Sequence, residues 1–441
     1  MAGPVSVPFA MSDLRSVLQE HADAAWSAAS DADVRVPGWR RRVVERIGRC
    51  GAPYAGFVWL RCDPCGVDRV VGASCKVSGV CPRCGGRRMA SVAVHQVERV
   101  LPAVPLRQWV VTFPQPLPRL LAWRPELLRA MLAALSRMLR EHLRAATGVS
   151  DGQSGMVAFV QTFTGDLRLY VHVHALVPDG VFVPTASGAR FVPAPVPTRE
   201  ALEAFAEALA GAVHRACVQW QRTLEPTEAD RAAEWLDRLA QEAEVETGPK
   251  PSRSERVVRR HRRWVARCAG LEVHAGVSVA ADDRRGRERL VRYTARAAVS
   301  LQRLSLDDEG RVCIRFKQPW RSGQVGVRLR PEVFVLRLAS LLLPPGVNRV
   351  RYLGVFGAAA RLRPHVVPQP PADAVSRPAG RWVPWRVLLL YTFGVDPTRC
   401  PRCGQPLRTV ATLLSSVRTF VALRWVRRGR GPPGLAVGVG P

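Results

Sequence analysis

The stretch MVAFVQTFTGDLRLYVHVHALV, residues 156–177, decides the fold. It contains two strand-like runs, 156–163 and 167–177, joined by the tripeptide Thr-Gly-Asp. A short connection that contains glycine favours a β-hairpin between two such runs. We therefore predict that these two runs are neighbouring strands.

The second strand of this hairpin carries His172 and His174. Residues i and i+2 of a strand point to the same face, so both imidazoles can meet one metal ion. Two histidines at this spacing also occur by chance, and a histidine pair packed in the core is the ordinary alternative.

Further elements surround the hairpin. Helical spacing of apolar residues or a strand-like pattern identifies each of them. We expect helices at 11–30, 88–104, 125–146, 199–223 and 287–304, strands at 107–114 and 271–280, and a second hairpin from 312–317 and 324–330. A polar and then basic linker at 245–264 and a proline-rich linker at 363–384 separate these parts.

The composition indicates a polyanionic partner. The 441 residues carry a formal net charge of +29, and 47% are hydrophobic, which allows two or three folded domains. Ribosomal and membrane-surface proteins are also this basic, so charge alone does not decide between them. No run approaches the roughly 18 apolar residues of a membrane span. Residues 1–20 lack the pattern of a secretory signal, so we expect a cytoplasmic protein without disulfides.

Four of the eleven cysteines predict a zinc site. Fifteen residues separate the pairs Cys62-x2-Cys65 and Cys81-x2-Cys84, which is the spacing of a tetrahedral four-thiolate site. Such a saturated site is architectural or DNA-binding, because it has no open coordination position. An iron–sulfur cluster and unrelated buried thiols are the alternatives, and Cys50 or Cys75 could replace one of the four.

A third pair, Cys400-x2-Cys403, is half of a metal site. Its partners are not evident in the sequence. His365, a distant cysteine and a second subunit are the three possibilities.

Tyr293 is the tyrosine with the most unusual surroundings. It lies among Arg289, Arg292 and Arg296, which could hold a phosphate and favour the phenolate. Tyr170 shares the strand face of the two histidines and is either part of the site wall or a substrate contact.

Five segments carry a resemblance to a known family. They are RCDPCGVDRVVGASCKVSGVCPRCGGRRMA (61–90), LYVHVHALVPDGVF (169–182), DDRRGRERLVRYTAR (282–296), YLGVFGAAARLRP (352–364) and VDPTRCPRCGQPLR (395–408). In this order they resemble the rolling-circle insertion-sequence transposases of the IS91 type and their common-region relatives. The resemblance extends from about residue 40 to about residue 415.

The resemblance implies an α+β protein with three parts. An N-terminal zinc-binding module (1–105) precedes a central HUH endonuclease domain (106–345), in which helices flank an antiparallel sheet. A small basic C-terminal region with a Cys knuckle (346–441) follows.

The resemblance also implies residue roles. His172 and His174 would hold Mg²⁺ or Mn²⁺, Tyr293 would be the nucleophile, and Arg296 would position the phosphate. A third metal ligand is expected, with Gln161 as first choice and His274 as second; an ordinary polar residue on a strand face is the alternative for each. The IS91 type uses two tyrosines four residues apart, but residue 289 is Arg, which is typical of the single-tyrosine branch.

The implied activity is nicking and rejoining of single-stranded DNA at transposon ends and of target DNA, through a 5′-phosphotyrosine, with the protein on the nucleoid when it is bound to DNA. A replication initiator or relaxase shares this chemistry. Two further hypotheses are a zinc-dependent nucleic-acid-binding protein without catalysis and a decayed transposase.

Overall fold

The centre of the protein is a six-stranded sheet in which every neighbouring pair is antiparallel. The structure is a computed structural model that describes residues 10–77, 79–221, 244–247, 264–320, 323–369, 396 and 398–413. In spatial order the strands are β14 (Val350–Gly354), β4 (Gly155–Phe163), β5 (Leu169–Pro178), β3 (Leu106–Thr112), β10 (Leu271–Val279) and β9 (Val265–Cys268).

The predicted hairpin is confirmed, because β4 and β5 pair directly. In this register Gln161 lies opposite His172, and Phe159 lies opposite His174. On the other side of β5, Val110 of β3 is the partner of His174. All nine residues of β4 are buried, as expected of a strand covered on both faces.

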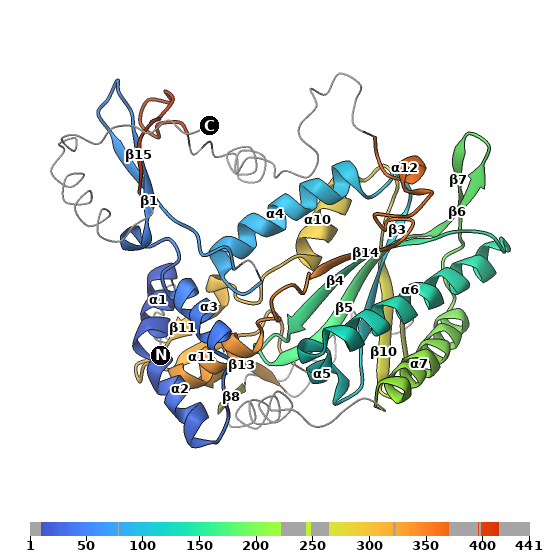
Figure 1. The fold of residues 1–441 in the computed structure, drawn as a ribbon, viewed down its shortest axis with the longest axis horizontal. Helices are drawn as coiled ribbons and strands as arrows, with labels where there is room; N and C mark the ends of the chain where they lie inside the picture. Colours follow the sequence, from blue (N-terminus) through green and yellow to red (C-terminus); the bar gives the residue numbers. More distant parts are fainter. Residues whose placement is uncertain are drawn as a thin grey trace.

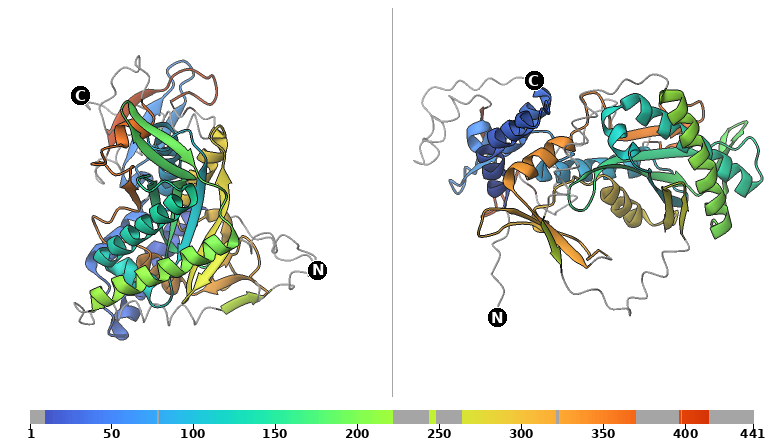
Figure 2. Two further views of the ribbon diagram at one scale, coloured as in Figure 1. Left: turned by 90° about the vertical axis from the view of Figure 1, so that its right-hand side faces the viewer. Right: turned by 90° about the horizontal axis from the view of Figure 1, so that it is seen from below.

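Three helices cover the face of the sheet opposite the histidines (Figures 1 and 2). They are α5 (Leu117–Trp123), α6 (Pro125–Thr147) and α7 (Arg199–Gln221). Alternate residues of the strands, including Trp109, Val173 and Val273, are buried in one core with these helices. The predicted helices at 125–146 and 199–223 are therefore confirmed over the described residues.

The histidine face is covered by α4 (Pro82–Arg99) and α10 (Arg284–Thr294), which pack through Val92, Ala93, Leu290 and Val291. The helix predicted for 287–304 was too long. It ends at Thr294, whose carbonyl accepts a hydrogen bond of 2.8 Å from Gln161 Nε2. The backbone N–H of Ala298 then donates to Gly79 O, which carries the chain away from the helix axis. The helix predicted for 88–104 instead begins within the second Cys knuckle, at Pro82.

A second core joins the N-terminal helices to a later part of the chain. Helices α1 (Met11–Glu20), α2 (Ala22–Asp31) and α3 (Gly38–Gly48) share this core with α11 (Pro331–Ser340), β11 (Leu304–Leu306), β12 (Val312–Arg315) and β13 (Gln324–Leu329). The predicted hairpin of β12 and β13 is confirmed. The same sheet includes β8 (Glu244–Thr247), and the short helix η2 (Leu301–Arg303) precedes β11. Buried Arg40 of α3 donates a hydrogen bond of 3.0 Å to Leu342 O, which links α3 to the segment that follows α11.

A small sheet at one side of the molecule has the order β15-β1-β2 (Figure 1). It consists of β1 (Phe57–Arg61), β2 (Asp68–Gly72) and β15 (Arg408–Leu413), with η1 (Pro53–Ala55) before β1. The remaining elements are the hairpin of β6 (Gly180–Thr185) and β7 (Gly188–Pro193), and α12 (Arg363–Val366). No helix in the described ranges combines the length and apolar character needed to cross a bilayer. Much of the predicted basic C-terminal region and most of both predicted linkers lie outside the described residues.

Candidate active site

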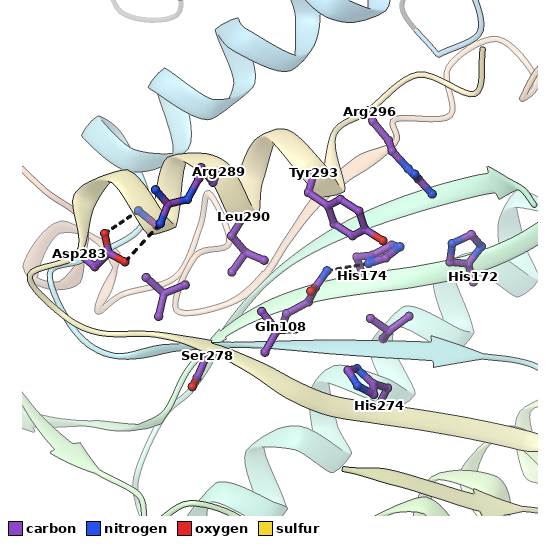
Figure 3. Close-up of a pocket in the computed structure, with 14 residues that line it drawn as sticks. Gln108, His172, His174, His274, Ser278, Asp283, Arg289, Leu290, Tyr293 and Arg296 are labelled. Carbon is purple, nitrogen blue, oxygen red and sulfur yellow. Dashed lines mark hydrogen bonds and ion pairs between the residues drawn. The ribbon is translucent and has the colours of Figure 1, made fainter. Parts of the chain in front are cut away.

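A pocket of about 720 Å³ lies between α10 and the histidine face of the sheet (Figure 3). Gly286, Arg289, Leu290 and Tyr293 line it from α10, because residues three, four and seven apart share one face of a helix. The side chain of Asp283 caps the start of this helix by accepting a 2.7 Å hydrogen bond from the backbone N–H of Gly286. The walls opposite come from β3, β5 and β10.

His172 and His174 meet in this pocket, with ring centroids 5.1 Å apart. The Nδ1 atom of His172 lies 3.1 Å from the carbonyl oxygen of Tyr170. Because a carbonyl only accepts, Nδ1 carries the proton and Nε2 keeps a free lone pair. The Nδ1 atom of His174 lies 2.7 Å from the side-chain amide of Gln108, and its Nε2 is buried without a hydrogen-bond partner among the described residues.

Both histidines are held in the neutral form. Burial lowers the pKa of His172, and the charge of Arg296 lowers it further. Burial, the neighbouring His172 and Arg296 together bring the pKa of His174 well below its ordinary value. A neutral imidazole with an unengaged nitrogen is the form that binds a metal ion.

Tyr293 lies over the histidines (Figure 3). Its ring centroid is 5.9 Å from that of His174, and its side chain is 45% exposed. The described residues give its hydroxyl no hydrogen-bond partner, whereas the Tyr170 hydroxyl donates to Phe113 O at 3.2 Å and the Tyr352 hydroxyl accepts from Gln96. Tyr293 therefore presents its oxygen to the pocket.

The three arginines near Tyr293 do not play the same part. The guanidinium carbon of Arg296 lies 5.0 Å from the centre of the Tyr293 ring, and Arg296 lines the pocket. Arg289 also lines the pocket, with a loose ion pair of 3.9 Å to Asp283. Arg292, which the sequence grouped with them, does not line it and pairs with Glu288 at 2.6 Å.

The structure separates the two predicted third ligands. Gln161 is 2% exposed, lies directly beside His172 on β4, and has a buried Oε1 without a partner among the described residues. It is not among the residues that line the pocket. His274 lines the pocket from β10, but β3 lies between it and the histidine strand. In the described residues, its nitrogens do not join those of the pair in a group of metal-ligand atoms within 4.8 Å.

Gln108 is a site residue that the sequence reasoning missed. It lies on β3, in the run Arg-Gln-Trp, and is 3% exposed. Alternation along β3 places Gln108 on the same face as Val110, the direct partner of His174. The sequence alone does not show that β3 pairs with β5, and without this pairing the alternation does not place Gln108 beside His174.

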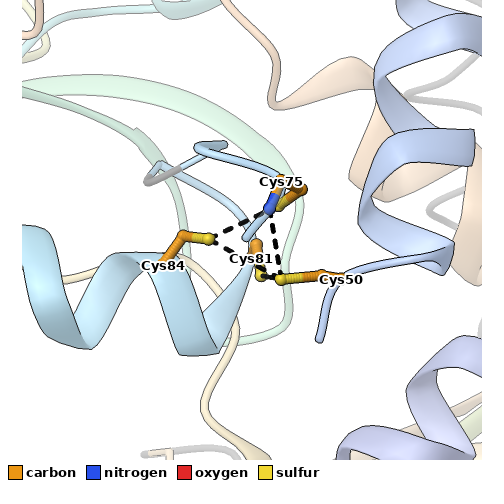
Figure 4. A group of neighbouring side chains, drawn as sticks. All are labelled: Cys50, Cys75, Cys81 and Cys84. Atoms are coloured by element: carbon orange, nitrogen blue, oxygen red, sulfur yellow. Dashed lines mark hydrogen bonds between the residues drawn. The ribbon is translucent and has the colours of Figure 1, made fainter. Parts of the chain in front are cut away.

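The four cysteines predicted to bind one zinc ion do not come together. Cys81 and Cys84 lie instead with Cys50 and Cys75 (Figure 4), with sulfur–sulfur distances of 3.5–3.7 Å among the pairs in contact. Four sulfurs at about 2.3 Å from a zinc ion in a tetrahedron are about 3.8 Å apart, so this cluster fits zinc. Cys62 and Cys65 lie in a different place, beside Cys400 and Cys403. The spacing rule failed because Cys50 and Cys75 complete the first cluster from outside the Cys-x2-Cys pattern.

Comparisons with known proteins agree with this architecture. A family model described as "Transposase zinc-binding domain" matches residues 17–113, and one described as "Putative transposase" matches residues 155–363. The chain is similar to a Sinorhizobium fredii protein named "Putative transposase y4qJ", at 24% identity over 326 residues that cover 72% of this chain and 74% of the relative. Together these matches support an IS91-type transposase. No solved structure matches the transposase.

The family assignment identifies DNA as a partner of this transposase and zinc as a structural metal. The transposase match includes both histidines, Gln161, Tyr293 and Arg296. Gln108 falls in the zinc-binding match, so strands from both matched regions build the pocket.

Proposed function

We propose that this transposase nicks single-stranded DNA at transposon ends with Tyr293 and rejoins it through a 5′-phosphotyrosine. The observation that carries the proposal is a tyrosine hydroxyl without a partner among the described residues, placed over two neutral histidines in an open pocket with two arginines. The pocket thus combines a candidate nucleophile, a histidine pair that could bind a metal ion, and two arginine side chains that could bind the phosphate.

In the proposed step, the phenolic oxygen of Tyr293 attacks the phosphorus of the scissile phosphodiester. The bond from phosphorus to the 3′ oxygen breaks, and the phenol proton leaves to solvent while the 3′ oxygen gains one. The link to Tyr293 conserves a phosphodiester, so a later 3′-OH can displace the tyrosine without an external energy source. Arg296, with its guanidinium carbon 5.0 Å from the centre of the Tyr293 ring, would attract the phosphate to this position.

The residues present fit a divalent cation beside the tyrosine. His174 Nε2 is a buried nitrogen without a partner in the described part of the chain, and the Tyr170 carbonyl leaves His172 Nε2 available. When bound by these nitrogens, Mg²⁺ or Mn²⁺ would polarise a non-bridging phosphate oxygen and help to orient it. As placed, Gln108 Nε2 faces Nδ1 of His174, so metal binding requires the Gln108 amide to be turned over. Its Oε1 would then accept from Nδ1–H, fix the ring and leave Nε2 of His174 for the cation.

Gln161 is our proposed third ligand, ahead of His274. Its Oε1 is buried beside His172 without a partner among the residues described, and its Nε2 holds the last carbonyl of α10. One side chain would thus tie the position of Tyr293 to that of the cation.

The test is a covalent-adduct assay. We would incubate the protein with labelled single-stranded oligonucleotides from both ends of its element, with Mn²⁺ or with Mn²⁺ omitted, and separate the products on denaturing gels. We expect a Mn²⁺-dependent protein–DNA adduct that Tyr293→Phe abolishes. Tyr170→Phe is the matched control, because its hydroxyl donates to a backbone carbonyl and should be dispensable.

Each outcome separates two hypotheses. An adduct that survives Tyr293→Phe keeps the enzyme class but removes Tyr293 as the nucleophile. Tight binding of single-stranded DNA without any adduct favours a zinc-dependent binding protein or a decayed transposase over a nickase.

A further inference from the structure

We propose that Cys62, Cys65, Cys400 and Cys403 bind a second zinc ion, which fastens the C-terminal segment of the chain to its N-terminal domain. This inference does not depend on the nicking mechanism. The "Transposase zinc-binding domain" match ends at residue 113 and the "Putative transposase" match at residue 363, so Cys400 and Cys403 lie outside both.

The sulfur atoms have the geometry of a tetrahedral thiolate site. Cys62 Sγ lies 3.4 Å from Cys403 Sγ, and Cys65 Sγ lies 3.4 Å from Cys400 Sγ and 3.6 Å from Cys403 Sγ. These separations are far longer than the ~2.0 Å of a disulfide and close to the ~3.8 Å expected around zinc. Four thiolates leave no open position, so the metal would be structural.

The two halves of the site are built alike. Each is a Cys-x2-Cys-Gly turn in which the glycine N–H donates to the carbonyl of the first cysteine, at 2.8 Å for Gly66 and 2.9 Å for Gly404. Both glycines have a left-handed backbone, with φ of 66° and 71°. Such turns direct both sulfurs to one point, and two of them facing each other complete a four-sulfur site.

The small sheet beside the four cysteines also joins the N-terminal and C-terminal segments. After the second turn, β15 pairs antiparallel with β1, from Arg408 opposite Arg61 to Leu413 opposite Phe57 (Figure 1). Asp63, within the first turn, makes an exposed ion pair with Arg408 at 3.0 Å. The strands therefore hold the two turns in register.

The apolar core of this unit is too small to explain the contact by itself. Phe57, Trp59 and Leu413 form one small cluster, and the side chains of Leu60 and Leu407 form another with Cys62 and Cys400. Bringing together cysteines that are 335 residues apart in the chain carries a large loop-closure entropy. Units with so little core are commonly held by a metal or by disulfides.

Zinc stoichiometry tests the proposal. The full-length protein should contain two zinc ions per chain, measured by plasma mass spectrometry. Cys62→Ser/Cys65→Ser should contain one, Cys400→Ser/Cys403→Ser should contain one, and the fourfold variant should also contain one, because both pairs serve a single ion. Cys217→Ser/Cys268→Ser is the control and should keep two.

The proposal is overturned if Cys400→Ser/Cys403→Ser keeps two zinc ions, or if the wild type binds only one. Should the serine variants fail to fold, alkylation of the wild-type protein decides. Cys403 is exposed, so its thiol should react rapidly with iodoacetamide unless zinc holds it. Protection of Cys403 in the zinc-loaded protein, lost on chelation, supports the site, and rapid alkylation with zinc present overturns it.

A second measurement tests the fastening itself. A protease site placed between residues 370 and 395 allows the chain to be cut between the transposase region and Cys400. The cut C-terminal piece should stay with the rest on gel filtration, and it should separate when the cut chain carries Cys62→Ser/Cys65→Ser. Separation of the pieces in the zinc-loaded wild type would contradict a metal clasp.

Discussion

Replacing Gln161 with leucine separates the two roles proposed for this side chain. Loss of the hydrogen bond to Thr294 O leaves a buried carbonyl unpaired, at a cost of about 1–3 kcal/mol. Loss of Oε1, which is buried without a partner among the described residues, removes a penalty of about the same size, roughly 1–3 kcal/mol. Without added divalent metal, we therefore expect the free energy of unfolding to change by no more than about 1 kcal/mol.

The response to Mn²⁺ should change much more. At a Mn²⁺ concentration 100 times the dissociation constant, binding stabilises the wild type by about 2.7 kcal/mol. Loss of a residue that merely supports a ligand weakens metal binding by up to about 100-fold, so loss of a ligand should weaken it at least that much. The leucine variant would then gain only about 0.4 kcal/mol from the same Mn²⁺.

The assay is urea unfolding of the zinc-loaded protein, with and without Mn²⁺, for the wild type, Gln161→Leu, Gln161→Glu and His274→Asn. Gln161→Glu keeps an oxygen ligand and should retain the gain in stability, as should His274→Asn. If Gln161→Leu still gains about 2.7 kcal/mol from Mn²⁺, Gln161 only supports α10 and is not a ligand. If the gain is lost in His274→Asn instead, the third ligand is His274.

Three other perturbations have defined outcomes. Arg107→Met should lower the free energy of unfolding by about 3–5 kcal/mol in urea titrations. Arg107 makes a two-point ion pair with Asp179, at 2.7 and 2.9 Å, and the substitution leaves the Asp179 carboxylate without this partner. Arg289→Ala should reduce the slope of log affinity for single-stranded DNA against log salt by about 0.7 in anisotropy titrations, whereas the control Arg292→Ala, whose guanidinium is already paired, should change it much less. Because burial lowers the pKa of His174 in the folded state, acidification from pH 7.5 to 5.5 protonates this residue first in the unfolded chain. The His174 titration should therefore cost up to about 1.4 kcal/mol of stability. Burial also lowers the pKa of His172, so in urea titrations without added metal His174→Gln should lose less stability than the wild type by about this amount, rather than none.

The regular elements followed from local patterns. The helices α6 and α7 have apolar residues three and four apart, and each hairpin consists of two strand-like runs joined by a short connection that contains glycine. The ends of α10 and α4 did not follow. Thr294 ends α10 because Gln161, 133 residues earlier in the chain, binds its carbonyl, and no local signal marks such a contact.

In the site, too, some features followed from local sequence and others depended on contacts between distant parts of the chain. The face shared by His172 and His174 follows from strand alternation, and Tyr293 was singled out by the arginines around it. The role of Gln108 required the pairing of β3 with β5, and the exclusion of Arg292 required the direction of its side chain on α10. The prediction that Cys62 and Cys65 share a site with Cys81 and Cys84 was wrong for a further reason. The cysteines that lie beside Cys62 and Cys65 are more than 330 residues away in the chain.

The cluster of Cys50, Cys75, Cys81 and Cys84 is placed to set the position of the tyrosine helix. Cys81 occupies the N-cap position, where α4 begins, and α4 packs along α10 through Val92 and Leu290.

The loop between Cys75 and Cys81 also holds the chain that leaves α10, because Gly79 O accepts the N–H of Ala298 at 3.1 Å, five residues after Tyr293. Two neighbours of the tyrosine helix are thus fixed by one four-cysteine cluster. A structural zinc ion there would stabilise the loop and the start of α4 together, and its removal should loosen the site at Tyr293 even though it lies outside the pocket. The zinc-binding region is therefore part of the scaffold that orients the proposed nucleophile.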